Sequence, residues 1–222
     1  MTDKQKTEDR IIIDQLGAIL IILGIVQLCW GIYTAPKGQF KLNFGFLLCG
    51  LLILFGNMRI VSGVRWLAWL ALAPAAIDLL APFLLTPRRL LLTEIRLATF
   101  QFIAATLTSL VAFCAIILVI RRLGSAPVLA ARVSAGRKLR DMRIPLALGV
   151  ALAAFFQITA AVVLYGDNAR KAEQMVAERM GPRYQYHTNF IGASYGDEKY
   201  VQATVQAWNE NELLLIPVRW DQ

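Results

Sequence analysis

Five long apolar stretches constrain the fold of this chain more than any other feature. They cover residues 11–33, 42–58, 64–86, 98–120 and 144–166. Each is close to the ~20 residues that one helical crossing of a bilayer requires. Because a backbone in hydrocarbon must satisfy its hydrogen bonds internally, each stretch is predicted to be a transmembrane helix. A hydrophobic content of 57% and a mean hydropathy of +0.54 agree with an integral membrane protein and exclude an ordinary soluble domain.

The distribution of basic residues predicts how these helices are oriented. Segments 1–10, 59–65 and 121–143 carry twelve Lys and Arg, whereas segments 34–41 and 87–97 carry five. Basic residues accumulate on the cytoplasmic side, so residues 1–10 are predicted to be cytoplasmic and the C-terminus extracytoplasmic, in the inner membrane of a bacterial-type cell. The net charge of +8 is therefore mostly an orientation signal, and nucleic acid is not an expected partner.

Small residues on these stretches predict close packing between helices. Those that stand out are Gly17, Gly24 and Gly31 at intervals of seven, Gly50, and Gly149 in the last stretch. A glycine on a helix surface lets a neighbouring backbone approach, so we expect a compact helical bundle over residues 11–166.

An ionisable residue within the third stretch is the main candidate site. Asp78 lies four residues after Pro74 and four before Pro82, and each proline removes a backbone donor and frees a carbonyl of the preceding turn. Counting from the helix ends predicts further polar residues at a similar depth: Gln27, Thr106, Gln157 and Thr159. A carboxyl group at this depth is costly unless it is paired, hydrated or protonated. Two interpretations remain open: a neutral or water-bonded Asp78 of structural value, or a group that handles protons or a ligand.

Residues 121–143 are predicted to be a basic loop at the inner leaflet. The side chains expected to contact anionic headgroups there are Arg132, Arg137, Lys138, Arg140 and Arg143. Apolar residues recur among them at helical spacing, so a short amphipathic helix is the alternative to a plain loop.

Residues 167–222 are predicted to form a small extracytoplasmic α+β domain. The pattern at 167–180 favours a helix, which Gly181 and Pro182 end. Strand-like runs at 184–191, 199–208 and 213–220 predict a three-stranded antiparallel meander, with alternate apolar residues of the second strand packing on the helix. Pro217 places the last strand at an edge, because proline cannot donate to a second neighbour.

The sequence carries none of the familiar catalytic or metal-binding motifs. The sequence contains no HExxH, GxSxG or P-loop motif, and its single histidine, His187, stands alone within a strand. The three cysteines, Cys29, Cys49 and Cys114, all fall in apolar stretches and indicate small packing residues. We therefore expect no metal site, no cofactor and no enzymatic activity.

The sequence favours an accessory or interaction protein of the membrane. Its extracytoplasmic domain would bind another membrane or periplasmic protein, or a second copy of this chain, and membrane lipids would surround its helices. The alternative is a small transporter or ion-coupled component centred on Asp78. A membrane enzyme acting on lipid comes third, because the acids and histidines that such chemistry requires are sparse.

Overall fold

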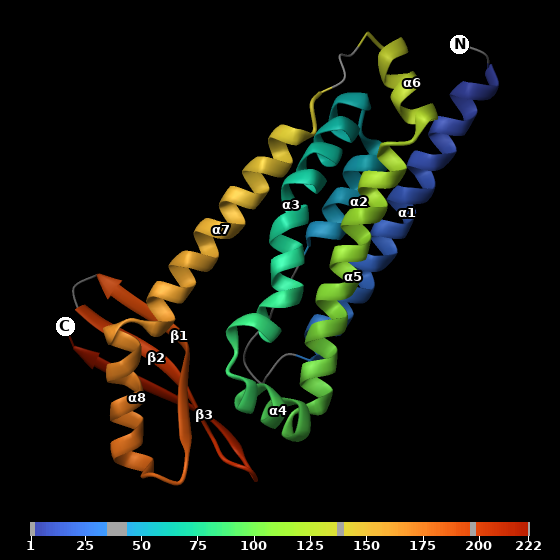
Figure 1. Ribbon diagram of the computed structural model, residues 1–222. Coiled ribbons are helices and arrows are strands. Elements are labelled where there is room, and N and C mark those ends of the chain that lie inside the picture. Colours follow the sequence, from blue (N-terminus) through green and yellow to red (C-terminus); the bar gives the residue numbers. More distant parts are fainter. Residues whose placement is uncertain (1–2, 35–43, 137–139, 196–198, 222) are drawn as a thin grey trace. The chain divides into compact units, whose positions relative to one another are not determined.

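The structure is a computed structural model that describes residues 3–34, 44–136, 140–195 and 199–221. Within these residues the chain forms eight helices and three strands (Figure 1). The chain separates into two compact units, and each is described by itself. The first comprises Met1–Leu80 and Ile103–Leu152, and the second comprises Ala81–Phe102 and Ala153–Gln222.

Helices alone build the first unit. These are α1 (Asp3–Thr34), α2 (Gly45–Phe55), most of α3 (Met58–Leu85), most of α5 (Thr99–Leu123), α6 (Ala126–Ser134) and the beginning of α7 (Arg143–Tyr165). The second unit holds α4 (Arg88–Leu97), the remainder of α7, α8 (Asp167–Met180) and the strands β1 (Gln185–Tyr195), β2 (Lys199–Trp208) and β3 (Leu213–Asp221).

Four of the helices, α1, α3, α5 and α7, are long and apolar enough to cross a membrane. The stretch predicted at 42–58 forms only the 11-residue α2 within the described residues. A helix of that length rises about 16 Å, little more than half of the ~30 Å hydrocarbon core. The chain is thus mostly helical and suited to a membrane, but the five predicted transmembrane helices are not confirmed.

Close contact between α1 and α2 depends on glycine. A side chain at Gly24 would place its Cβ 2.6 Å from the backbone nitrogen of Leu47, and one at Gly50 would lie 2.8 Å from the carbonyl oxygen of Gly17. Gly17 thus pairs with Gly50, and the later Gly24 pairs with the earlier Leu47, so the two helices are antiparallel. The role expected for Gly17, Gly24 and Gly50 in close packing is confirmed.

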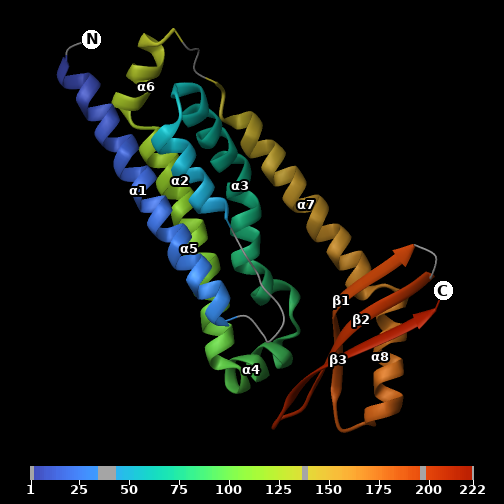
Figure 2. The ribbon, with the colours of Figure 1, turned by 180° about the vertical axis from the view of Figure 1, so that it is seen from behind.

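One apolar cluster joins the helices at the end of the unit where α1 begins. Ile13 of α1, Val61 of α3, Leu123 of α5 and Val128 of α6 are all buried in it. The start of α3, the end of α5 and α6 therefore lie beside the start of α1, as Figures 1 and 2 both show. Because α1 and α3 begin at the same end of the unit, the chain between them returns to that end.

A proline and a glycine together bring α7 against α3. Pro74 cannot donate a hydrogen bond to the carbonyl of Leu70, one turn earlier in α3. A Cβ at Gly149 would lie 2.2 Å from that same carbonyl oxygen. The Leu70 carbonyl, which Pro74 leaves without its helical donor, is thus the group that Gly149 of α7 approaches most closely.

The second unit contains the predicted meander. Its strands pair antiparallel in the order β1-β2-β3, so β3 with Pro217 is an edge strand as expected. The helix α8 covers one face of this sheet and buries Val176 with Val205 and Val218. We call the opposite face of the sheet the open face.

Two predicted loops contain helices. Residues 88–97 form α4, which buries Leu90 completely and exposes its three arginines. Residues 126–134 form the helix α6, so this part of the segment is not the plain loop expected there, and a helix weighed as the alternative is present. Its placement on the inner leaflet stays a prediction. Pro127 did not preclude that helix because it lies in the first turn, where no backbone donor is needed.

The α1–α2 contact predicts a contrast between two glycines. We expect Gly24→Ala to lower stability by about 1–3 kcal/mol, because the new methyl group meets the backbone of Leu47. Gly63→Ala is the matched control. Nothing lies within 4 Å of its Cβ position, so it should be neutral or stabilising by about 0.5–1 kcal/mol. Thermal unfolding of the detergent-solubilised protein measures both, and equal melting temperatures for the two variants would contradict the packing.

Candidate functional site

Asp78 is held by a hydrogen bond between two membrane-length helices. The hydroxyl of Ser109 on α5 donates to Asp78 Oδ2 on α3 at 2.7 Å. The Asp78 side chain is otherwise exposed on the surface of the helices. The carboxyl group and the hydroxyl both present oxygen atoms, which are the kind of ligand that a small hard cation prefers.

The other residues predicted around Asp78 are divided between the units. Thr106 lies three residues before Ser109 on α5, so the two share one side of that helix. Gln27 of α1 has an enclosed Oε1 without a hydrogen-bond partner among the described residues, and it makes no hydrogen bond to Asp78. Gln157 and Thr159 belong to the part of α7 in the second unit, so their joining Asp78 stays a prediction.

Sequence reasoning missed Ser109. Counting residues from the helix ends pointed to Thr106, and Ser109 is one turn further along α5. The sequence did hold a signal for Ser109. Its hydroxyl lies three residues after that of Thr106, and residues three apart on a helix face the same neighbouring helix.

The predicted lipid-contacting residues also differ among themselves. Arg140 and Arg143 are exposed, whereas Arg137 and Lys138 lie outside the described residues. Arg132 is only 6% exposed, because α6 packs against α1 and buries the same side that carries Val128. The contact of these residues with lipid headgroups stays a prediction.

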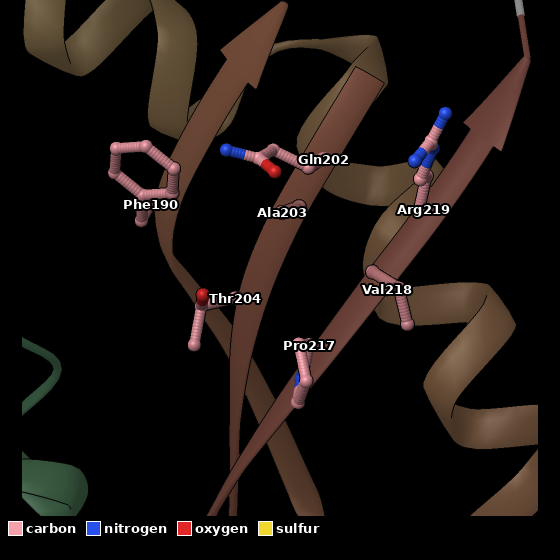
Figure 3. Close-up of a pocket in the computed structure, with 7 residues that line it drawn as sticks. All are labelled: Phe190, Gln202, Ala203, Thr204, Pro217, Val218 and Arg219. Carbon is pink, nitrogen blue, oxygen red and sulfur yellow. The ribbon is translucent and has the colours of Figure 1, made fainter. Parts of the chain in front are cut away.

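A shallow pocket occupies the open face of the sheet (Figure 3). Its volume is about 260 Å³, and it is lined by Phe190, Gln202, Ala203, Thr204, Pro217, Val218 and Arg219. At its rim the Arg219 guanidinium lies 3.6 Å from the centre of the Tyr200 ring, a cation–π contact that fixes its direction. The pocket offers an apolar wall with amide, hydroxyl and guanidinium groups beside it.

A β-bulge turns Phe190 into this pocket. Thr188 pairs with Val205 and points toward α8, where its hydroxyl bonds to the carbonyl of Ala169 at 3.2 Å. The register then shifts, and Phe190 pairs with Thr204 on the open face. Without the bulge, regular alternation would have put Phe190 on the same face as Thr188. The ring is 50% exposed there.

Elsewhere on the open face, α4 contacts the sheet. Gln206 Nε2 donates to Glu94 Oε1 of α4 at 3.0 Å, and His187 is the cross-strand partner of Gln206. Burial lowers the pKa of His187 below its ordinary 6.5, while the carboxylates of Glu173 and Glu94 act in the opposite direction. The His187 ring also lies 5.9 Å from that of Tyr165.

Within the described ranges, no three His, Cys, Asp or Glu side chains lie together in a way that could hold a metal ion. In comparisons with protein-family models, with curated proteins and with solved structures, no match to this chain was found. The function is therefore inferred from the residues and geometry of the protein itself.

His187 predicts how the second unit responds to pH. Its pKa is lower in the folded than in the unfolded chain, so the unfolded chain binds a proton first as the pH falls. Its full contribution to stability is therefore present above pH 6.5 and is lost progressively below it. We expect protease resistance of residues 167–222 to fall between about pH 7.5 and pH 5.5. In His187→Gln that fall should be smaller, and an identical fall in both proteins would contradict this assignment.

Proposed function

We propose that this protein is a multi-pass membrane protein that binds a partner polypeptide through its C-terminal α+β domain. The open face of the sheet carries the proposal. Phe190 is 50% and Leu215 is 61% exposed on this face, although a soluble domain ordinarily buries such side chains. Exposed apolar groups with a polar rim are typical of protein–protein interaction sites.

The shape of this face fits a polypeptide. The pocket of Figure 3 has an apolar wall at Phe190 and Pro217, and Gln202 and Thr204 supply hydrogen-bonding groups beside it. Arg219 adds a guanidinium directed by Tyr200. The expected partner is another membrane or periplasmic protein, or a second copy of this chain. No catalytic role is proposed.

The proposed topology has the N-terminus in the cytoplasm, five crossings of the inner membrane and the C-terminal domain outside. The direction of α3 supports it: α3 begins beside the start of α1, as it would if the chain between them crossed the membrane a second time. The apolar helix α2 lies in that segment, antiparallel to α1. The helix α7 begins at the same end of the first unit as α3 (Figures 1 and 2), which fits a crossing in the same direction, and the basic segments favour a cytoplasmic location for that end.

Reporter fusions test the topology. An alkaline phosphatase fused after Gln222 should be active, because the enzyme folds only outside the cytoplasm. The same enzyme inserted after Ser134 of α6 should be inactive, and a fluorescent protein that folds only in the cytoplasm should give the opposite pair of results. An inactive phosphatase after Gln222 together with a fluorescent fusion there would exclude the five-crossing topology.

Substitution of the open face tests the binding of a partner. We expect Phe190→Ser to weaken recovery of a co-purifying protein from gently solubilised membranes by about tenfold or more, the loss typical of a central interface residue. Gln174→Ser, on an exposed position of α8, is the control and should change nothing. Both variants should keep the protease resistance of the domain. Equal recovery by wild type and Phe190→Ser would place the contact elsewhere.

A second candidate function is ion coupling at Asp78. The observation that favours it is the hydrogen bond from Ser109, which joins a carboxyl group to a neighbouring membrane helix. Such a bond between helices supplies a link whose strength depends on the protonation of the carboxyl group.

Asp78→Asn separates this candidate from a structural role. The amide oxygen still accepts from Ser109, so folding should be unchanged or improved because a costly charge is removed. If Asp78 carries a proton, the variant abolishes proton flux into reconstituted vesicles, as followed with a pH-sensitive dye. Ser109→Ala keeps the carboxyl group, so it should alter the pH profile of the flux and retain transport. Undiminished flux through Asp78→Asn would rule out the candidate.

A further inference from the structure

The helix α4 connects the end of one membrane-length helix to the start of another. Only Thr86 and Pro87 separate it from α3, and only Ala98 separates it from α5. The Phe83 ring near the end of α3 lies 6.0 Å from the Phe102 ring near the start of α5, so these two ends lie side by side (Figures 1 and 2). The ten residues of α4 rise about 15 Å, which is too short to cross a hydrocarbon core of ~30 Å. A chain that crosses along α3 and returns along α5 therefore keeps α4 at one face of the membrane.

One side of α4 is covered and carries its single carboxylate. Leu90 is completely buried, and Glu94, one turn later, accepts the hydrogen bond from Gln206 of β2. The sequence of the helix, RRLLLTEIRL, contains no other acidic residue. Because this carboxylate is directed toward the sheet, the three arginines of α4 have no negative charge on their own side of the helix.

The opposite side of α4 combines exposed apolar residues with arginines. Leu92 is two residues after Leu90, and two residues turn a helix by about 200°, so the two leucines point in nearly opposite directions. Leu92 is 66% and Ile95 is 38% exposed. Arg88 and Arg96 lie one turn before and one turn after Leu92, and both are exposed. Apolar residues flanked by long cationic side chains are typical of a helix that lies along a membrane surface.

We propose that α4 lies in the headgroup layer and binds anionic phospholipid through Arg88, Arg89 and Arg96. Leu92 and Ile95 contact the adjoining ends of the acyl chains, and the guanidinium groups donate paired N–H groups to the lipid phosphates. Three cations spread along an exposed helix match a surface of many phosphates better than one free anion. This site depends on the crossing of the membrane by α3 and α5, which belongs to the proposed topology, and not on the binding of a partner.

Hydrogen exchange of α4 tests the site. The full-length protein is placed in nanodiscs of phosphatidylcholine alone or of phosphatidylcholine with phosphatidylglycerol, and exchange of the backbone amides of residues 88–97 is followed by mass spectrometry. Each basic residue near an anionic surface strengthens attachment about fivefold, so phosphatidylglycerol should slow this exchange about tenfold or more in wild type. The double variant Arg88→Gln with Arg96→Gln should lose most of that slowing. Arg88→Lys with Arg96→Lys keeps both charges and should keep most of it.

Arg179→Gln with Arg183→Gln is the matched control, because it removes the same charge from exposed positions of the second unit outside α4. It should respond to phosphatidylglycerol as wild type does. Sodium chloride at about 1 M screens charges beyond ~3 Å and should abolish the slowing in wild type. This measurement tests the site even if the glutamine variant fails to fold.

Equal exchange of wild type in the two kinds of nanodisc would overturn the proposal, as would equal slowing in wild type and in Arg88→Gln with Arg96→Gln. Inorganic phosphate added to nanodiscs of phosphatidylcholine should leave the exchange unchanged. A slowing as large as that caused by phosphatidylglycerol would overturn the lipid as the source of the phosphate.

Extraction of cell membranes at alkaline pH checks the crossing of α3 and α5 separately. Wild type that resists extraction but shows no effect of phosphatidylglycerol would overturn the α4 site alone. Release of wild type by this treatment would overturn the crossings together with the site that depends on them.

Discussion

The close approach of α1 and α2 is the contact on which the helical unit depends. The position of the 11-residue helix α2 beside α1 comes from backbones that meet at Gly17, Gly24 and Gly50. In hydrocarbon, burying apolar groups gives no advantage over lipid, so van der Waals contact between closely spaced backbones has to hold such helices together. That contact returns the chain to the end where α1 began, and the core shared by α3, α5 and α6 forms there.

The second unit is organised by the two faces of one sheet. On one face α8 supplies the apolar layer that a three-stranded sheet requires, with Val176 against Val205. On the other face α4 contributes through Glu94 and Gln206, although α4 lies between two membrane-length helices in the sequence. The short domain thus gains a second covering element from a distant part of the chain, as its small size would require.

Sequence patterns predicted regular elements well and the contacts between them less well. The helix at 167–180 and the three strands followed from period and turn residues, which act locally. The helix α4 was overlooked because its arginines suggested an exposed loop, although Leu90 and Leu97 lie seven residues apart, on one side of a helix. Asp78 was found from its residue type, but its partner Ser109 was not, because a pairing across helices depends on their rotation. Charge alone did not reveal that α6 turns Arg132 against α1, where only 6% of this residue is exposed.

The bulge in β1 has a consequence for which side chains the domain presents. Residues before it and after it alternate in opposite phase, so Thr188 and Ile191, three positions apart, both face α8. If all the residues of β1 paired in regular alternation, without the bulge, the two faces would be exchanged from Phe190 onward. Phe190 would then enter the interior and Ile191 would take its place outside. Loss of Asn189, by contrast, would remove the bulge and leave Phe190 outside and Ile191 inside. The extra residue is therefore tolerated only because the strand bulges around it, and the bulge preserves the aromatic group that the domain presents.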